Sequence, residues 1–128
     1  MTKWTGETGK ARFVILVVED DDDLGEAITF VLKEAGFETE LIRDGINAMQ
    51  WIREQVPDLV LLDMHLPGIS GLEILDRVRS DARFAKVRVM VTTADLMAAK
   101  AAEGKADVIF TKPYSVTDLL DSVAKFSP

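Results

Sequence analysis

The sequence predicts an α/β fold in which helices cover both faces of one parallel sheet, and three observations lead to that prediction. Short aliphatic runs alternate with segments of helical period from residue 13 onward. The runs are nearly continuous in Val, Ile and Leu, which is typical of strands buried on both faces. A helical segment follows each run, and strand–helix repeats of this kind form parallel sheets with right-handed crossovers.

Five strands are expected, and four of them are strongly apolar. The apolar runs are FVILVV (residues 13–18), DLVLL (58–62), VRVMVT (87–92) and DVIFT (107–111). The run FETELI (37–42) carries more charge and fits an edge strand.

Five helical segments follow these strands, because apolar residues recur there at spacings of three and four. The candidates are residues 24–35, 45–54, 72–78, 95–103 and 116–123. Gly36 and Gly104 follow two of them at positions where helices often end. The pattern therefore amounts to five strand–helix pairs.

Composition predicts one domain and excludes several classes of function. The chain has 128 residues, 48% of them hydrophobic, which suits a single core formed by residues 13–128 after a flexible tail of residues 1–12. Its net charge of -7 argues against direct contact with nucleic acid or anionic membranes. It has no cysteine and a single histidine, His65, so a disulfide framework and a multi-histidine zinc site are excluded. Without a secretory or membrane-spanning segment, we expect a cytoplasmic protein.

The first strand runs directly into five consecutive acids, residues 19–23. Two unit charges about 4 Å apart interact by roughly 4 kcal/mol at an effective dielectric constant near 20, so acids crowded at a strand end call for a positive partner. Asp21, Asp22 and Asp23 are explained as the cap and first turn of the next helix. Helix capping does not require Glu19 and Asp20 as well, so we interpret these two acids as metal ligands.

Other polar residues close the remaining strands. Asp63 ends the third strand, Thr92 and Thr93 end the fourth, and Lys112 with Pro113 ends the fifth. In an open α/β sheet, ligands bind beyond the carboxyl ends of the strands. These residues are therefore expected to meet Glu19 and Asp20 at one edge of the sheet.

This ordered set resembles the receiver domain of two-component response regulators over residues 13–126. The matching motifs are the acidic pair, LLDMHLPGISGLE around Asp63, TA after the fourth strand and KP after the fifth. The resemblance implies a flavodoxin-like (βα)5 domain with strand order 2-1-3-4-5. It also implies signalling by phosphorylation rather than turnover of a substrate.

The resemblance assigns a phosphoryl acceptor and a magnesium site. Asp63 would accept a phosphoryl group from a sensor histidine kinase or a histidine phosphotransfer protein. Mg²⁺ would be held by Glu19, Asp20, Asp63 and the backbone carbonyl of His65, whose side chain we expect to face solvent. Oxygen ligands of this kind suit the octahedral coordination of Mg²⁺.

The resemblance also assigns the residues that would bind the phosphoryl group. Thr93 would donate a hydrogen bond to it and Lys112 would pair with it, while Pro113 would follow a cis peptide bond. Because side chains alternate along a strand, only one of Thr92 and Thr93 faces the pocket. Thr93 is the better match to the motif, and Thr92 is the alternative.

Two departures from the family pattern concern how phosphorylation would be coupled to a downstream partner. The interval from Thr93 to Lys112 is shorter than in many receivers by nearly one helical turn. Ile109 stands where an aromatic switch residue is frequent, with Phe110 beside it. We therefore expect altered coupling to a downstream protein partner, to a missing output domain or to a phosphorylation-dependent dimer.

Two other functions compete with a phosphoacceptor. A Mg²⁺-dependent phosphatase working through an aspartyl phosphate commonly carries an acid two residues after the nucleophile, where this chain has His65. A pseudo-receiver scaffold would not need the complete set of acceptor, acidic pair, threonine and lysine. A carrier of flavin is disfavoured because the acids after the first strand would repel its phosphate.

Overall fold

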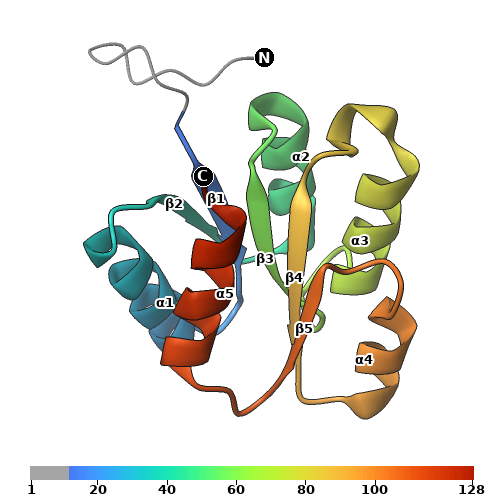
Figure 1. The fold of residues 1–128 in the computed structure, drawn as a ribbon. Coiled ribbons are helices and arrows are strands. Elements are labelled where there is room, and N and C mark those ends of the chain that lie inside the picture. Colours follow the sequence, from blue (N-terminus) through green and yellow to red (C-terminus); the bar gives the residue numbers. More distant parts are fainter. Residues whose placement is uncertain (1–11) are drawn as a thin grey trace.

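A computed structural model describes residues 12–128, in which five parallel strands lie between two layers of helices (Figure 1). The strands pair in the order β2-β1-β3-β4-β5, so the predicted fold and strand order are confirmed. They are β1 (Val14–Val18), β2 (Glu38–Ile42), β3 (Leu59–Asp63), β4 (Arg88–Thr93) and β5 (Val108–Thr111). The predicted tail, apart from Arg12, lies outside the described residues.

The helices divide between the two faces of the sheet (Figure 1). They are α1 (Asp22–Glu34), α2 (Gly45–Gln55), α3 (Gly71–Ser80), α4 (Leu96–Ala102) and α5 (Val116–Phe126). α1 and α5 pack on the face formed by residues such as Val17, Leu61 and Met90. α2, α3 and α4 pack on the face that carries Leu62 and Val91. Both faces are apolar because alternate strand residues point to opposite sides, which explains the unbroken aliphatic runs.

The acids after β1 begin the first helix as expected. Asp21 is the N-cap of α1, and its carboxylate accepts a hydrogen bond from the Leu24 N–H at 3.0 Å. Asp22 and Asp23 lie in the first turn, where the helix dipole favours negative charge. Glu19 and Asp20 precede the helix and take no part in capping it.

The structure differs from the predicted elements mainly at their ends. β4 ends at Thr93 and not at residue 92. A short 3₁₀ helix, η1 (Ala82–Phe84), was not predicted, because only three residues form it and it shows no apolar period. Its Phe84 is 1% exposed and fills the core beside α2 and α3. Among residues 12–128, no helix has the length and apolar character needed to span a membrane.

α2 begins directly against the loop that follows β3. The Gly45 N–H donates a hydrogen bond to the Pro67 carbonyl at 3.1 Å. A Cβ at Gly45 would overlap the backbone carbonyl of Ile69, so this close approach requires glycine. The loop after Asp63 is therefore held by the start of α2.

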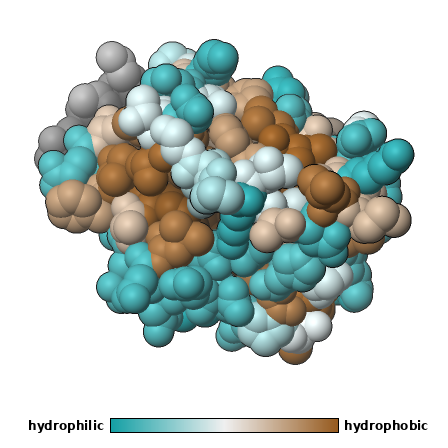
Figure 2. Space-filling model, turned by 90° about the horizontal axis from the view of Figure 1, so that it is seen from below, coloured by the Kyte–Doolittle hydropathy of each residue, from teal (hydrophilic) through white to brown (hydrophobic). Residues whose placement is uncertain are grey.

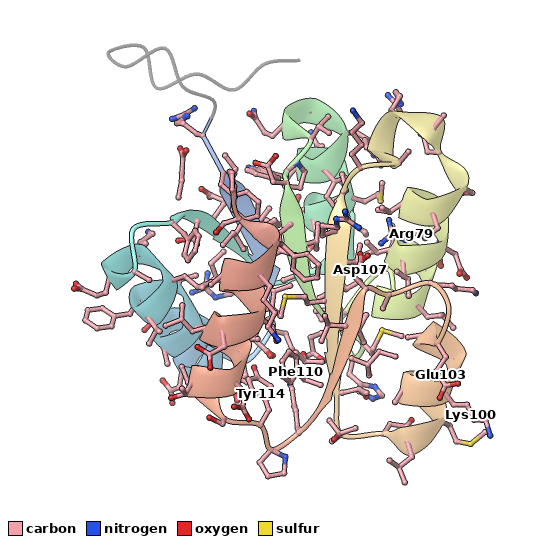
Figure 3. The ribbon with its side chains drawn as sticks, viewed as in Figure 1. Arg79, Lys100, Glu103, Asp107, Phe110 and Tyr114 are labelled. Carbon is pink, nitrogen blue, oxygen red and sulfur yellow. The ribbon has the colours of Figure 1, made fainter. Side chains whose placement is uncertain are left out.

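Arg79 ties the end of α3 to the segment leading into β5 (Figure 3). Its guanidinium donates hydrogen bonds to the carbonyls of Lys105 and Val87 at 2.6 and 2.8 Å. It also pairs with Asp107 at 2.7 Å, and Asp107 in turn accepts a hydrogen bond from the Val89 N–H at 2.8 Å. This network fixes the edge of the sheet opposite the ends of β1 and β3.

Candidate functional site

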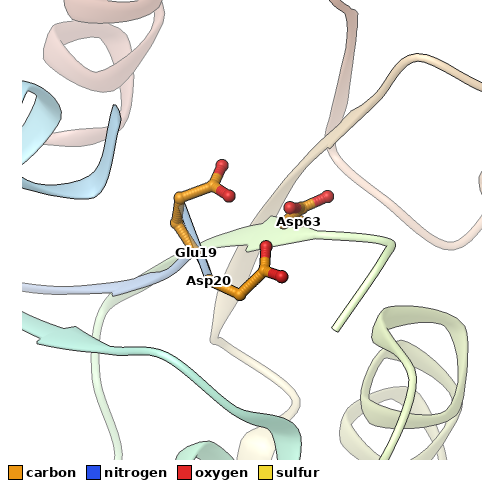
Figure 4. A group of neighbouring side chains, drawn as sticks. All are labelled: Glu19, Asp20 and Asp63. Atoms are coloured by element: carbon orange, nitrogen blue, oxygen red, sulfur yellow. The ribbon is translucent and has the colours of Figure 1, made fainter. Parts of the chain in front are cut away.

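Three carboxylates gather where β1 and β3 end (Figure 4). Glu19 and Asp20 directly follow β1, and Asp63 is the last residue of β3. The two strands are neighbours in the sheet, with Val18 opposite Leu62. One oxygen from each carboxylate lies within 4.8 Å of the others, so residues 44 positions apart in the sequence form one acidic cluster.

Two of these acids are buried, and one lysine pairs with both of them. Glu19 is 3% exposed and Asp63 is 4% exposed, whereas Asp20 faces solvent. The Lys112 ammonium lies 3.2 Å from Glu19 Oε1 and 3.4 Å from Asp63 Oδ2. Lys112 directly follows β5, so the charge that the acids require comes from the other end of the chain.

Backbone groups complete the hydrogen bonding of the buried acids. The Asp21 N–H donates to Glu19 Oε2 at 3.2 Å, and the His65 N–H donates to Asp63 Oδ1 at 3.1 Å. The His65 side chain is exposed, as expected. Asp63 is thus held in one orientation, with Oδ2 toward the ammonium.

The surroundings of Glu19 disfavour the charged form of its carboxyl group and raise its pKa. Burial, followed by its hydrogen bond with Asp63 and the charge of that residue, raises the pKa of Glu19 from 4.5 to about 7, although the Asp21 N–H and Lys112 oppose the change. Burial disfavours the charged form of Lys112, but the charges of Asp63 and Glu19 outweigh it and raise the pKa of the ammonium. The lysine therefore stays charged. Its single positive charge is smaller than the combined negative charge that the three carboxylates can carry.

The two threonines of β4 lie on different faces of the sheet. Thr92 is opposite Asp63 and shares the face of Met90, whereas Thr93 shares the face of Val91. Both side chains are buried. The Thr93 hydroxyl accepts a hydrogen bond from the Asp95 N–H at 3.0 Å. Among the hydrogen bonds of residues 12–128, neither hydroxyl reaches Asp63, so the choice between the threonines stays a prediction.

The segment after β5 carries the last residues of the site. The Lys112 N–H donates to the Thr93 carbonyl at 2.7 Å, which joins the ends of β4 and β5. The peptide bond between Lys112 and Pro113 is cis, as the family resemblance implied. Tyr114 follows, and its hydroxyl is buried without a hydrogen-bond partner. Tyr114 was not among the predicted site residues; its one signal in the sequence is its place two residues after Lys112.

The residue at the aromatic switch position points away from the acidic cluster. Ile109 packs into the core beside Val91, on the face covered by α2, α3 and α4. Phe110 lies on the opposite face and stacks on Tyr114, with ring centroids 5.7 Å apart. α4 has seven residues, in line with the short interval between Thr93 and Lys112.

Exposed apolar side chains come from the helix starts at this edge of the molecule. Ile46 is the second residue of α2, Leu96 and Met97 begin α4, and Val116 begins α5. Leu96 and Met97 are each 75% exposed. Figure 2, which looks at this edge from below, shows hydrophobic side chains between hydrophilic ones.

Comparison with known proteins identifies the family. The sequence model of the response regulator receiver domain matches residues 15–124. The DNA-binding response regulator MtrA of Mycobacterium tuberculosis (strain ATCC 25618 / H37Rv) is 38% identical over 109 residues, which are 85% of this chain and 48% of that protein. The sensory transduction protein RegX3 of Mycolicibacterium smegmatis is 32% identical over 83% of this chain and 46% of its own length. The chain spans about half the length of the curated relatives it matches.

Solved structures share the fold. The signal receiver domain of a signal transduction histidine kinase from Syntrophus aciditrophicus superposes with a TM-score of 0.82 at 27% identity, covering 88% of both chains. The receiver domain of the sensor histidine kinase PA1611 from Pseudomonas aeruginosa PAO1 has a TM-score of 0.80 at 24% identity, and the match covers 91% of this chain and 98% of that one. These likenesses agree with the strand order found here.

Proposed function

The chain belongs to the response regulator receiver domains of two-component signalling, and from this premise we propose that Asp63 is its phosphoryl acceptor. The observation that carries the proposal is the contact of Lys112 with both Glu19 and Asp63 inside a cluster of three acids. A buried aspartate beside an ammonium can attack phosphorus, because the cation offsets the charge that the phosphoryl oxygens bring.

The acidic cluster fits Mg²⁺. Glu19, Asp20 and Asp63 offer carboxylate oxygens, the ligands that Mg²⁺ prefers, and Asp20 is open to the solvent from which a hydrated ion arrives. We propose that these three residues hold the ion together with the carbonyl of His65. Bound there, Mg²⁺ would neutralise the phosphoryl oxygens and the buried acids. The related receiver domain of PA1611 has a magnesium ion coordinated in its active site cleft.

Each residue of the site would then have its own role in the transfer of the phosphoryl group. The His65 N–H holds Asp63 Oδ1, which leaves Oδ2 as the oxygen that forms the new bond to phosphorus. The bond from phosphorus to the donor's leaving atom breaks in the same step, and the electron pair leaves with that atom. Lys112 moves from the carboxylates toward the transferred phosphoryl group. The domain promotes its own phosphorylation and dephosphorylation and turns over no other substrate.

Phosphorylation would change the conformation of the loop between β4 and α4. The Thr93 hydroxyl now donates a hydrogen bond to the Asp95 carbonyl at 3.4 Å, and a phosphoryl group carrying about -1.5 to -2 charges is a stronger acceptor for that proton. When Thr93 turns toward Asp63, it carries the start of α4 with it, including the exposed Leu96 and Met97. The signal is this displacement, which changes the surface offered to a partner.

We propose protein partners at this edge of the sheet. A sensor histidine kinase or a phosphotransfer protein must bring its phosphohistidine to Asp63, and the exposed apolar side chains at the starts of α2, α4 and α5 suit such a contact. The relative MtrA is a DNA-binding response regulator, so the expectation that no nucleic acid is involved is not confirmed for the whole protein. We propose that the acidic segment described here contacts protein, in the cytoplasm, and passes its signal to an output partner or by dimerisation.

Phosphorylation by a small donor tests the proposal. With Mg²⁺ and phosphoramidate, the intact mass should rise by one phosphoryl group, and EDTA should prevent the rise. Asp63→Asn should abolish the label, whereas Asp76→Asn, at an exposed acid of α3 that pairs with Lys105, should keep it. A label that survives Asp63→Asn would show that another residue is the acceptor.

The two threonines can be separated with beryllofluoride, which stands in for the phosphoryl group. Thr93→Val should weaken its binding and leave the Ala94 amide unshifted. Thr92→Val keeps the buried volume of that side chain and should bind normally. The reverse result would assign the phosphoryl contact to Thr92.

A further inference from the structure

The hydroxyl of Tyr114 is a polar group that the fold buries without giving it a partner. Among the described residues, only two buried side-chain polar atoms lack a hydrogen bond, Tyr114 Oη and Thr39 Oγ1. A buried hydroxyl without a partner destabilises a protein, so such groups are rare and call for an explanation.

Tyr114 lies at the end of a row of residues that leads across the sheet to the acceptor. Its ring stacks on Phe110, with the ring planes tilted by 48° (Figure 3). Phe110 is opposite Thr92 on β4, and Thr92 is opposite Asp63 on β3. Side chains opposite one another in a parallel sheet share a face, so the ring of Tyr114 lies on the face toward which Asp63 projects.

The charges of the site act on this hydroxyl. Burial, followed by the charges of Glu19 and then Asp63, raises the pKa of Tyr114 to about 12. The hydroxyl is therefore protonated at neutral pH and can serve only as a donor to these carboxylates. Glu19 is the stronger of the two influences.

Glu19 is the carboxylate that would lose a donor when the domain is phosphorylated. It is 3% exposed and, besides its interaction with Asp63, accepts hydrogen bonds from Lys112 and the Asp21 N–H. Lys112 is shared with Asp63, and a phosphoryl group on Asp63 would draw the ammonium toward itself. A buried carboxylate that loses a hydrogen-bond donor is destabilised unless another donor takes its place.

We propose that Tyr114 is a positioning residue of the site, whose hydroxyl donates a hydrogen bond to the Glu19 carboxylate in the phosphorylated state. It would take the place of Lys112 and hold Glu19 in its orientation toward the metal. The inference rests on the proposed phosphorylation of Asp63. It explains why the unphosphorylated protein leaves this hydroxyl without a partner.

Two variants that each remove one unpaired hydroxyl provide the test. Tyr114→Phe deletes Oη and keeps the ring that stacks on Phe110. Thr39→Val deletes the other unpaired hydroxyl, on β2 opposite Ile15, and is the matched control. Neither should unfold the protein, because each removes a group that has no partner. In Mg²⁺, the dissociation constant of beryllofluoride should rise about tenfold or more in Tyr114→Phe, as expected for a lost hydrogen bond to a charged group. It should not change in Thr39→Val.

A spectroscopic signature separates positioning from packing. Tyr114 is the only tyrosine, so labelling tyrosine with ¹³C at Cζ gives a single NMR resonance. That resonance should shift when Mg²⁺ and beryllofluoride are added together. An unmoved resonance overturns the inference, and so does an unchanged dissociation constant in Tyr114→Phe. If the wild-type protein itself neither binds beryllofluoride nor accepts phosphate, the proposed function fails instead.

Discussion

Replacing Glu19 by glutamine should make the stability of the protein less sensitive to pH. The carboxyl of Glu19 is 3% exposed and lies in the cluster with Asp63. Its pKa is about 7 in the folded protein, compared with 4.5 as the ordinary value, chiefly because of burial. Glutamine has nearly the same shape and carries no charge, so the variant removes the titration and keeps the packing.

The magnitude follows from the difference between the two pKa values. A carboxyl whose pKa is raised by folding contributes stability that is complete below pH 4.5 and lost as the pH rises to about 7. At about 1.4 kcal/mol for each pK unit, the wild-type protein loses about 3 kcal/mol across this window. Glu19→Gln does not lose it, so relative to the wild type the variant should gain up to about 3 kcal/mol between pH 4.5 and pH 8.

Urea unfolding in EDTA at several pH values measures this difference. Glu34→Gln, at an exposed acid near the end of α1, controls for the change in net charge. At pH 8, added Mg²⁺ should stabilise the wild-type protein more than Glu19→Gln, because the ion relieves the repulsion that the variant lacks. A free-energy difference between wild type and Glu19→Gln that stays constant with pH would refute the account of the buried acid.

Three further variants test the framework around the site. Gly45→Ala should lower the free energy of unfolding by about 1–3 kcal/mol, because the new Cβ overlaps the Ile69 carbonyl; an unchanged urea midpoint would contradict that contact. Asp44→Ala removes the N-cap of α2 and should cost about 1 kcal/mol, also read from urea unfolding, whereas a cost near zero would mean that water replaces the cap. Arg79→Gln should speed amide hydrogen exchange at the Asp107 end of its network, and equal exchange rates would show that the network does not hold that segment.

Periodicity and aliphatic runs were enough to predict the fold class and most of the helices and strands. The apolar runs correspond to β1 and β3 within a residue, because a strand buried on both faces cannot tolerate polar residues. The strand order came from family resemblance, since local patterns do not say which strands are neighbours. η1 was not predicted because its three residues are too few to show a hydrophobic period. Its position depends on Phe84, which is buried in the core.

The meeting of the acids with Lys112 could be predicted because the carboxyl ends of parallel strands share one edge. The details of that edge could not. Which carboxylate oxygen contacts the ammonium depends on the His65 N–H, and the pairing of Thr93 with Asp95 depends on a loop. The unpaired hydroxyl of Tyr114 depends on packing from α5 and β5, which no local pattern encodes.

The salt bridge between Lys112 and Glu19 joins residues 93 positions apart, which directly follow the first and the last strand along the chain. During synthesis, the acids therefore leave the ribosome long before their counter-charge does. A nascent chain that stops short of β5 lacks the lysine that pairs with Glu19 and Asp63. If Asp63 is the acceptor proposed above, only chains that have been synthesised through β5 and Lys112 would carry the complete site.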